Sequence, residues 1–590
     1  MIMKKIGFIV LFLMGVLFSL SQEKNNNILR EFNQPKLQWW QQARFGMFIH
    51  WGPVSLTGKE LSWSRAGYGI SKYDSLYLRF NPTKFNADKW VSTAKQAGMK
   101  YMVLTAKHHD GFCLWNTKTT NYNIMQTPFG RDVCKELANA AHKANMPICW
   151  YFSVADWKAA DCRNPKTNHL FVDRVLAQLT ELLTNYGKIP LLWIDYEGMP
   201  SPIQPKLVYE LANKLQPGII INNRLDVLHT DESHSYIGKW GDYATPEGFV
   251  AGYGAIPWET CTNLGHQWAW KFNDTPRSLK EAATTLLRCV GGNGNLLLNV
   301  GPDSLGQIPS DFESRLQEFG NWLTPIQKSI YATNGGPYAP TKNVVSSYAN
   351  KSVFIHVLNT KTDTIILPPL SIKILDAKLM NGDSVSIIQN KNSVQLIFLK
   401  PHLDSISTTV ELTLQKPAEL VGIIKPLSTS SSLAYAKKAT ASSSVGQFLH
   451  DVSAAFDDNP NTYWLLGRND SVNTDVYFGT SVHYIRNRDE MNKIFNTSGW
   501  LEVDLGKSQL VGSVKLLEHV LMKSQILDFE IQYRKERNWV TWVRDTQMGN
   551  WQKTLQPVKA RYFRLVINKR DYVSGIREFK LFPPLISSNY

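Results

Sequence analysis

Polar and charged side chains recur where apolar runs end in the first half of the chain. The residues at six successive run ends are His50, His108 with His109, Tyr151, Asp195, Arg224 and Glu259. The carboxyl ends of parallel barrel strands meet at one face, and catalytic groups of barrel enzymes sit there. The pattern therefore predicts one shared pocket. For any single residue the alternative is an exposed strand end or a structural ion pair.

Two carboxylates on different strands can divide the work of glycoside cleavage. One attacks the anomeric carbon, while the other protonates the departing oxygen and later activates water. Asp195 directly follows the apolar run 190–194, and Arg224 or a histidine beside it would keep it charged. Glu259 follows Trp258, and an aromatic wall raises the pKa of a carboxyl group towards that of a general acid. These two acids are the predicted catalytic pair.

Three other acids compete for these roles. In an extended strand Glu197 would point to the same face as Asp195, but it lies beyond the apolar run. Asp242 and Glu247, in the segment 241–247, compete with Glu259. The sequence leaves these alternatives open.

The adjacent histidines His108 and His109 have two interpretations. Neighbouring residues of an extended strand point to opposite faces, so they rarely ligate one ion together. The neighbouring Asp110 does not bring the two histidines onto one ion either. Hydrogen bonding of at least one histidine to a polyhydroxylated ligand is therefore favoured over metal binding, and we predict no catalytic metal.

Apolar runs and amphipathic segments alternate over residues 30–335. The predicted strands are Phe45–Trp51, Tyr101–Ala106, Pro147–Val154, Pro190–Asp195, Gly218–Asn223, Ile256–Cys261 and Leu296–Val300. The predicted helices are Asn86–Gly98, Arg131–Asn145, Asp173–Tyr186, Pro205–Leu215, Ser278–Val290 and Pro309–Leu323. This alternation predicts an α/β fold with a parallel sheet. A (β/α)₈-like barrel with irregular elements is favoured over an open doubly wound sheet, and no GxGxxG motif follows the first strand.

The second half of the chain is β-rich. Residues 336–420 alternate apolar and polar positions, with turn signals at Asn381-Gly382 and Lys391-Asn392, and predict an antiparallel β-sandwich. The segment Lys425–Ser432 reads as a linker to a further β-rich domain over 434–586.

Composition narrows the class of protein. The formal net charge is +15, but no run of five Lys or Arg occurs, which disfavours nucleic-acid binding. Residues 1–21 have the charged start, short apolar run and small residues of a signal peptide. No Cys precedes Cys113, which excludes a lipoprotein anchor at the cleavage site, so a secreted or periplasmic protein without a membrane anchor is expected. The six cysteines have no CxxC spacing, and both disulfides and buried thiols remain open.

Several of these segments resemble the α-L-fucosidases of glycoside hydrolase family 29. The matching segments, in family order, are Phe45–Gly52 (FGMFIHWG), Ala106–Phe112 (AKHHDGF), Leu192–Asp195 (LWID), Pro257–Cys261 (PWETC) and Gly291–Pro302 (GGNGNLLLNVGP). The resemblance implies a retaining enzyme with a barrel followed by a β-sandwich. It implies that Asp195 is the nucleophile and Glu259 the acid/base. The positions implied to line the sugar pocket are His50, Trp63, His108, His109, Tyr151, Arg224 and Trp268.

The chain departs from the family pattern beside these residues. Tyr196 follows the nucleophile where glycine is usual, and Ser62 precedes Trp63 where an acid is common. Trp270 stands two residues after Trp268, where the family usually has tyrosine. Phe152 directly follows Tyr151, where the family usually has a second tyrosine. These departures bear on the sugar that is bound.

The last domain resembles discoidin-like, coagulation factor type C-like domains. The matching segments are Ala455–Trp464, Gly499–Gly506, Ala560–Leu565 and Ile576–Leu581. The resemblance implies a β jelly roll, a role in carbohydrate binding and a possible structural calcium near Asp457 and Glu578. The expected function is an exo-acting α-L-fucosidase with a fucosylated glycan substrate. A non-catalytic lectin, or a glycosidase for a related sugar such as α-L-galactose, is the alternative.

Overall fold

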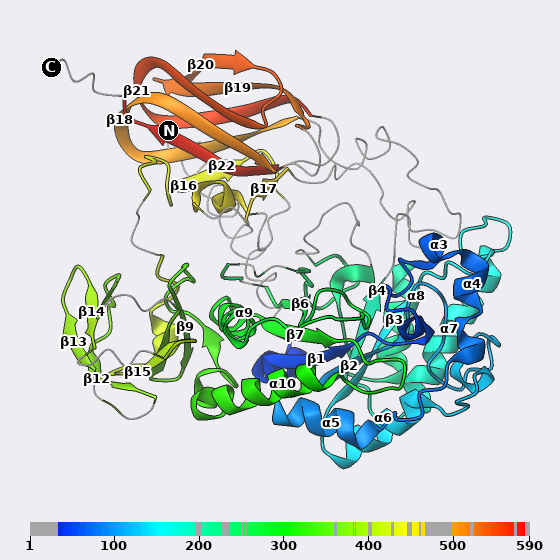
Figure 1. The fold of residues 1–590 in the computed structure, drawn as a ribbon. Helices are drawn as coiled ribbons and strands as arrows, with labels where there is room; N and C mark the ends of the chain where they lie inside the picture. The colour runs from blue at the N-terminus through cyan, green and yellow to red at the C-terminus, as the bar shows by residue number, and fades with distance from the viewer. Residues whose placement is uncertain are drawn as a thin grey trace, which may run out of the picture.

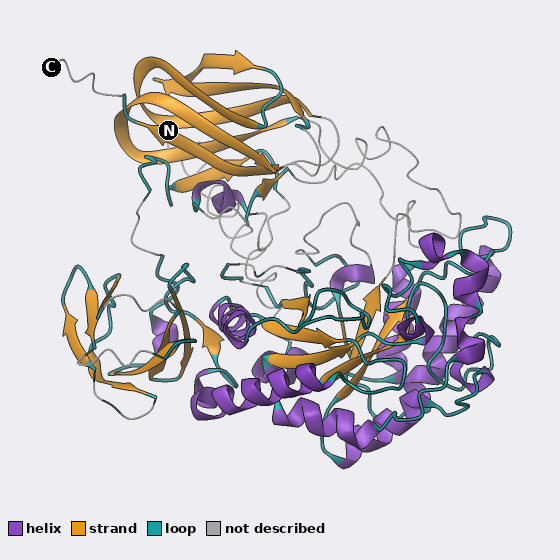
Figure 2. Ribbon diagram, viewed as in Figure 1, coloured by secondary structure: helices purple, strands orange, loops and turns teal. Residues whose placement is uncertain are grey.

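The chain folds into a helix-wrapped parallel sheet, two small antiparallel sheets and a C-terminal antiparallel sheet (Figure 1). Figure 2 shows that most helices belong to the first of these parts. The computed structural model describes residues 34–195, 203–225, 237–248, 250, 252–254, 256–358, 363–380, 383, 385–398, 404–425, 430–444, 451–458, 462–466, 498–519, 524–570 and 575–584. The predicted signal peptide, Glu197 and the predicted turn Asn381-Gly382 lie outside these residues.

Within the described residues, seven parallel strands form one sheet in the order β5-β4-β3-β2-β1-β7-β6. Each overlaps a predicted strand, and β6 begins at Glu259 rather than at Ile256. The parallel sheet predicted from the sequence is therefore confirmed. The strands are Phe45–Ile49 (β1), Met102–Lys107 (β2), Ile148–Ser153 (β3), Leu191–Asp195 (β4), Ile220–Ile221 (β5), Glu259–Asn263 (β6) and Asn295–Val300 (β7).

An extended segment that the sequence did not predict as a strand lies between β5 and β6. Tyr243 pairs in parallel with Asn222, just after β5, through an isolated bridge. Glu247 pairs in parallel with Cys261 of β6 in the same way. The segment 242–247 therefore takes the eighth strand position and joins the two edges of the sheet into a barrel.

The helices lie outside the sheet, as a (β/α)₈-like barrel requires. The side chain of Asn86 caps α5, and Ser278 forms a capping box with Glu281 at the start of α9. The helices are Pro35–Ala43 (α2), Arg65–Tyr68 (α3), Ile70–Asp74 (α4), Ala87–Gln96 (α5), Val133–Lys143 (α6), Asn168–Thr184 (α7), Pro205–Leu215 (α8), Leu279–Gly291 (α9) and Ser310–Leu323 (α10). No helix of the described residues combines the length and the apolar character needed to span a membrane.

Alternate residues of each strand fill the barrel interior. In β4, Leu191, Trp193 and Asp195 share this inner face, because side chains of a strand alternate. Helix α2 leads directly into β1, and its Trp40 belongs to the same buried cluster at the amino end of the strands. Asp195, in contrast, is the last residue of its strand and stands at the carboxyl end.

The small antiparallel sheets form the predicted β-sandwich. Among the described strands, one sheet has the order β12-β15-β10-β9-β8 and the other β11-β14-β13. Lys391-Asn392 lies in the turn between β13 and β14, as predicted. Gly291 at the end of α9 lies against β9, where an added Cβ would approach Val345 Cβ to 2.8 Å. The strands are Asn334–Gly335 (β8), Val344–Ala349 (β9), Ser352–Val357 (β10), Thr364–Leu367 (β11), Ile374–Leu379 (β12), Ser386–Gln389 (β13), Val394–Ile397 (β14) and Thr408–Leu414 (β15).

The C-terminal sheet has its own hydrophobic core, centred on residues such as Trp464, Phe529 and Phe563. Among the described strands the order is β17-β22-β18-β21-β19-β20, and β16 pairs with β18. The strands are Lys438–Ala441 (β16), Trp464–Leu465 (β17), Gly499–His519 (β18), Ile526–Lys535 (β19), Asn538–Asp545 (β20), Asn550–Arg570 (β21) and Gly575–Phe582 (β22). The antiparallel jelly-roll-type domain expected from the sequence is confirmed.

Candidate active site

A pocket of about 90 Å³ lies at the carboxyl ends of the barrel strands. It brings together every predicted site residue except Glu259, and it adds Glu247. The lining residues are Phe48, His50, Trp63, His108, His109, Tyr151, Trp193, Asp195, Arg224, Glu247, Cys261 and Trp268. The prediction that the run ends converge therefore holds for all but one of them.

Asp195 receives hydrogen bonds from two sides. The hydroxyl of Tyr151, from the neighbouring strand β3, donates to Oδ2 at 2.8 Å. Arg224 Nη1 donates to Oδ1 at 3.3 Å, and His109 Nε2 lies 3.7 Å from Oδ2. Only 13% of the Asp195 side chain is exposed. Donors aimed at a carboxylate stabilise its charged form, which is the form that attacks as a nucleophile.

Arg224 links this carboxylate to a second one. It lies in the 3₁₀ turn Asn223–Leu225, directly after β5, and its guanidinium stacks 4.6 Å from the centre of the Trp193 ring. Burial by itself lowers the pKa of Arg224, but the charges of Glu247 and Asp195 raise it above the ordinary value. Arg224 is therefore a permanent buried cation between two acids.

Glu247 is the second acid at the mouth of the barrel. Its Oε2 accepts a hydrogen bond from Arg224 Nη2 at 2.6 Å, and 35% of its side chain is exposed. The segment 242–247 carries it to the carboxyl end of the barrel, next to Cys261 of β6. A partly exposed carboxyl group that lines the pocket can exchange protons with solvent and with a leaving group bound there, as a general acid and base must.

The structure corrects the placement of Glu259. It is the first residue of β6 and pairs with Asn295, the first residue of β7, so it lies at the amino end of the barrel. Trp40 Nε1 donates to Oε2 at 3.0 Å, and Trp193 Nε1 donates to Oε1 at 3.3 Å. Tyr101 also donates its hydroxyl to Oε2.

Burial raises the pKa of Glu259 to about 7, although these three donors oppose the shift. The side chain is fully buried and does not line the pocket. The sequence-based strand began three residues too early, at Ile256 instead of Glu259, and so placed this acid near the wrong end of the strand. The aromatic groups that contact Glu259 are Trp40, Tyr101 and Trp193, and they belong to the barrel interior and not to the site.

The histidines are held through their Nδ1 atoms by neighbouring polar groups. The pairs are His50 with Asn299 Oδ1 at 2.8 Å, His108 with Ser62 Oγ at 2.6 Å and His109 with Ser153 Oγ at 2.7 Å. Burial lowers the pKa of His50 to about 3 and that of His108 well below its usual range. These two rings are therefore neutral at physiological pH.

His108 and His109 do not point to opposite faces. Strand β2 ends at Lys107, so the alternation of a strand stops before them. Their ring centroids lie 4.3 Å apart, and both line the pocket. In the part of the chain that the structure describes, no three His, Cys, Asp or Glu side chains gather as a metal site.

The aromatic rim of the pocket is supported by residues that carry no strong sequence signal. Trp63 is 52% exposed and meets Trp157 edge to face at 5.2 Å. Glu60 accepts backbone N–H bonds from Trp268 at 2.8 Å and from Ala269 at 2.9 Å, which fixes the loop that carries Trp268. Four supporting residues were missed because they hold the backbone or the histidine rings through hydrogen bonds and do not take part in the reaction themselves. They are Glu60, Ser62, Ser153 and Asn299.

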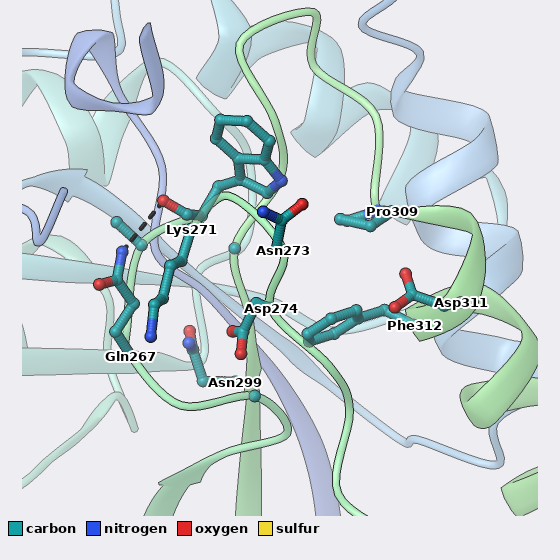
Figure 3. Close-up of a pocket in the computed structure, with 12 residues that line it drawn as sticks. Gln267, Lys271, Asn273, Asp274, Asn299, Pro309, Asp311 and Phe312 are labelled. Carbon is teal, nitrogen blue, oxygen red and sulfur yellow. Dashed lines mark hydrogen bonds between the residues drawn. The ribbon is translucent and has the colours of Figure 1, made fainter. Parts of the chain in front are cut away.

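A second cavity of about 170 Å³ is lined by Asn299, whose side chain also bonds to His50 of the first pocket (Figure 3). Gln267 Nε2 donates to the Trp270 carbonyl oxygen at 3.0 Å within it, and Asp274 and Asp311 supply its carboxyl groups. Asp274 already accepts His266 Nδ1 at 2.6 Å. These acids lie apart from the pocket of Asp195.

One of the two residues expected to hold calcium in the C-terminal domain, Glu578, lies near a protein cation. Lys580 contacts Asp458 and lies 3.9 Å from Glu578, and Asp457 accepts the Thr462 hydroxyl at 2.8 Å. Burial raises the pKa of Glu578 to about 8. Parts of the surrounding loops lie outside the described residues, so the calcium ion stays a prediction.

A parallel barrel with acids, histidines and aromatic rings at the carboxyl ends of its strands defines the class as a barrel glycoside hydrolase. A family model for α-L-fucosidase matches residues 18–327, and a model for the F5/8 type C domain matches residues 438–579. The chain belongs to the α-L-fucosidase family, glycoside hydrolase family 29, and carries a C-terminal discoidin-like domain.

Individual relatives agree with this membership. The α-L-fucosidase 1 of Arabidopsis thaliana is 31% identical over 321 residues, which are 50% of this chain and 60% of that protein. The solved α-L-fucosidase isoenzyme 1 of Paenibacillus thiaminolyticus is 30% identical, with a TM-score of 0.58, and the match covers 65% of this chain and 99% of that one. The Thermotoga maritima α-fucosidase, solved with a mechanism-based inhibitor, is 26% identical, with a TM-score of 0.54 and coverage of 65% and 98%.

Proposed function

We propose that the chain is a secreted, retaining, exo-acting α-L-fucosidase in which Asp195 is the nucleophile and Glu247 is the general acid and base. The observation that carries this proposal is the single guanidinium of Arg224, which contacts both carboxylates at the mouth of the barrel. Glu259 is not assigned to this role because it is buried at the opposite end.

In the first step, Asp195 attacks the anomeric carbon and the bond to the leaving oxygen breaks. Glu247 gives its proton to that oxygen as the bond breaks, and a covalent glycosyl-enzyme forms. In the second step, Glu247 takes a proton from water, the water attacks the anomeric carbon, and the bond to Asp195 breaks. Two inversions retain the configuration of the sugar. The mechanism-based inhibitor bound to the Thermotoga maritima relative supports such a covalent route.

The shape of the pocket supports removal of one terminal sugar. It is small, and Trp193 and Phe48 close it towards the barrel interior. Phe48 and Trp268 meet edge to face at 6.1 Å and form an apolar corner. Such a corner suits the C6 methyl group of fucose better than the hydroxymethyl group of L-galactose. The hydroxyl groups of the sugar would meet the histidines.

Hydrolysis of an aryl α-L-fucoside, compared with the matching aryl α-L-galactoside, tests the proposal. We expect the fucoside to be preferred and Asp195→Ala to lose nearly all turnover. Added azide should restore part of it by attacking in place of the carboxylate, giving a glycosyl azide of inverted configuration. Asp311→Asn, in the neighbouring cavity, is the matched control and should keep its activity.

Absence of turnover on both glycosides and on fucosylated oligosaccharides would contradict the enzymatic proposal. Calorimetric binding of L-fucose in that case would support the lectin alternative. Secretion is proposed on the pattern of residues 1–21 alone. It is tested separately by N-terminal sequencing of exported protein, which should begin near Gln22.

A further inference from the structure

Each pocket histidine is held through Nδ1 by one polar side chain that also bonds elsewhere. Because a neutral imidazole carries one proton, the hydrogen bond at Nδ1 decides whether Nε2 is a donor or an acceptor. The other bonds of each partner show in which direction the Nδ1 bond runs. The partners are Asn299 for His50, Ser62 for His108 and Ser153 for His109.

Asn299 fixes the proton of His50. The amide nitrogen of Asn299 donates to Asn263 Oδ1 at 2.9 Å and to the Trp268 carbonyl oxygen at 2.8 Å. The Asn299 oxygen that faces His50 is therefore an acceptor, and Nδ1 of His50 carries the proton. Since burial keeps this ring neutral, Nε2 of His50 is left as an acceptor.

Ser153 fixes a proton on Nδ1 of His109, as Asn299 does for His50. The Ser153 hydroxyl donates to the Ala155 carbonyl oxygen at 2.8 Å, so its oxygen accepts from His109 Nδ1. Nδ1 of His109 therefore carries a proton. Its Nε2 lies 3.7 Å from Asp195 Oδ2, a spacing at which one substrate hydroxyl can lie beside both groups.

For His108, the hydrogen bond at Nδ1 runs in the opposite direction, from Ser62 to the ring. The Ser62 oxygen accepts the backbone N–H of Asp110 at 3.0 Å, and among the described residues the acceptor within reach of its own proton is His108 Nδ1, at 2.6 Å. Nε2 of His108 therefore carries the ring proton and is a donor. Ser62 adopts a left-handed backbone with φ of 59°, and its N–H bonds to the Tyr73 hydroxyl at 2.8 Å, which holds the hydroxyl in place.

We propose that Ser62, Ser153 and Asn299 are positioning residues that fix which nitrogen of each pocket histidine carries a proton. Nε2 of His50 is an acceptor and Nε2 of His108 is a donor, while His109 keeps a proton on Nδ1, so the pocket selects the hydrogen-bond direction of the sugar hydroxyls as well as their position. The identity of the ligand as a sugar rests on the proposed function. The tautomers themselves do not depend on it.

Nitrogen-15 NMR of histidine-labelled, ligand-free, full-length protein tests the tautomers directly. The spectrum has 13 histidines to resolve, and His50→Gln, His108→Gln and His109→Gln assign the relevant signals. We expect a protonated Nε2 for His108 and a protonated Nδ1 for His50 and His109. A protonated Nδ1 on His108, or a common tautomer for all three, overturns the proposal without any variant being needed.

Two variants then show whether Ser62 positions His108 or only supports the fold. Ser62→Ala should give His108 a mixture of tautomers and lower kcat/KM roughly three- to tenfold, the range for one lost hydrogen bond. Ser55→Ala is the control, because Ser55 is equally buried but donates to the Gly52 carbonyl oxygen and contacts no pocket histidine. It should leave both the tautomers and kcat/KM unchanged. An unchanged His108 tautomer in Ser62→Ala contradicts the proposal.

Competitive inhibition by L-fucose and its analogues tests the consequence for the sugar. Fluorine can accept weakly but cannot donate, so the hydroxyl that meets His108 should tolerate fluorine better than hydrogen. The hydroxyl that meets His50 should lose roughly tenfold in affinity with either replacement. An equal loss of affinity at every ring hydroxyl overturns the proposed selection of hydrogen-bond direction. No binding of L-fucose, with the tautomers intact, instead contradicts the proposed function.

Discussion

Asp195 and Glu247 contact the same guanidinium group, at 3.3 Å and 2.6 Å from the two terminal nitrogens of Arg224. The two acids come from different strand positions of the barrel, and the buried cation between them fixes both. One acid is nearly buried and the other is half-exposed. This relationship divides the acids into a nucleophile and a proton carrier.

The hydroxyl of Tyr151 should matter for chemistry and not for folding. Tyr151→Phe removes the 2.8 Å hydrogen bond to Asp195 but keeps the stacking of the ring on His108 and Trp193. We expect kcat to fall roughly 10- to 100-fold, since a hydrogen bond to a charged group contributes about 1.5–3 kcal/mol. Tyr186→Phe, which removes a bond to Asp132, is the control. Equal kcat in both variants would contradict this role.

Glu259 should make folding stability depend on pH. Its pKa in the folded protein is about 7, above about 4.3 in an unfolded chain. Between these values the folded protein keeps a proton that the unfolded chain has released, so the stabilising contribution is full below about pH 4 and is lost as the pH rises to about 7. Glu259→Gln does not titrate and should escape this loss.

Urea unfolding at pH 5 and pH 8 measures this difference. The free energy of unfolding of Glu259→Gln relative to wild type should rise by about 2–3 kcal/mol between the two pH values. Glu313→Gln, in the first turn of α10, serves as the matched Glu→Gln control. An identical pH dependence for Glu259→Gln and wild type would contradict a buried, protonated Glu259.

The C-terminal domain should be separable from the catalytic part. Its hydrophobic core shares no residue with the cores of the barrel and the sandwich, whereas the barrel core extends to Val345 of the sandwich. A chain that stops near Ser430 should remain folded and hydrolyse a small fucoside at an unchanged rate, while binding to large glycans weakens. Size-exclusion chromatography and activity assays check this. Aggregation of the shortened chain would show that the last domain covers an apolar face.

Sequence patterns located the strands with long apolar runs and the residues that end them. Asp195 was found because the run 190–194 is unbroken, and β4 ends where that run does. The segment 242–247 pairs only through isolated bridges and lacks an apolar run, so no strand was predicted there and Glu247 ranked behind Glu259. The roles of Ser62, Ser153 and Asn299 could not be predicted, because they depend on contacts with histidines that are distant in the sequence.

Mass spectrometry of the two glutamate variants after mixing with an activated aryl α-L-fucoside tests the central claim. Glu247→Ala lacks the base for the second step, so it should release a burst of phenol and accumulate a fucosyl group on Asp195. Glu259→Ala, if it folds, should show neither burst nor adduct. The account predicts an adduct on Asp195 in Glu247→Ala alone. A burst and adduct in Glu259→Ala, with none in Glu247→Ala, would contradict it.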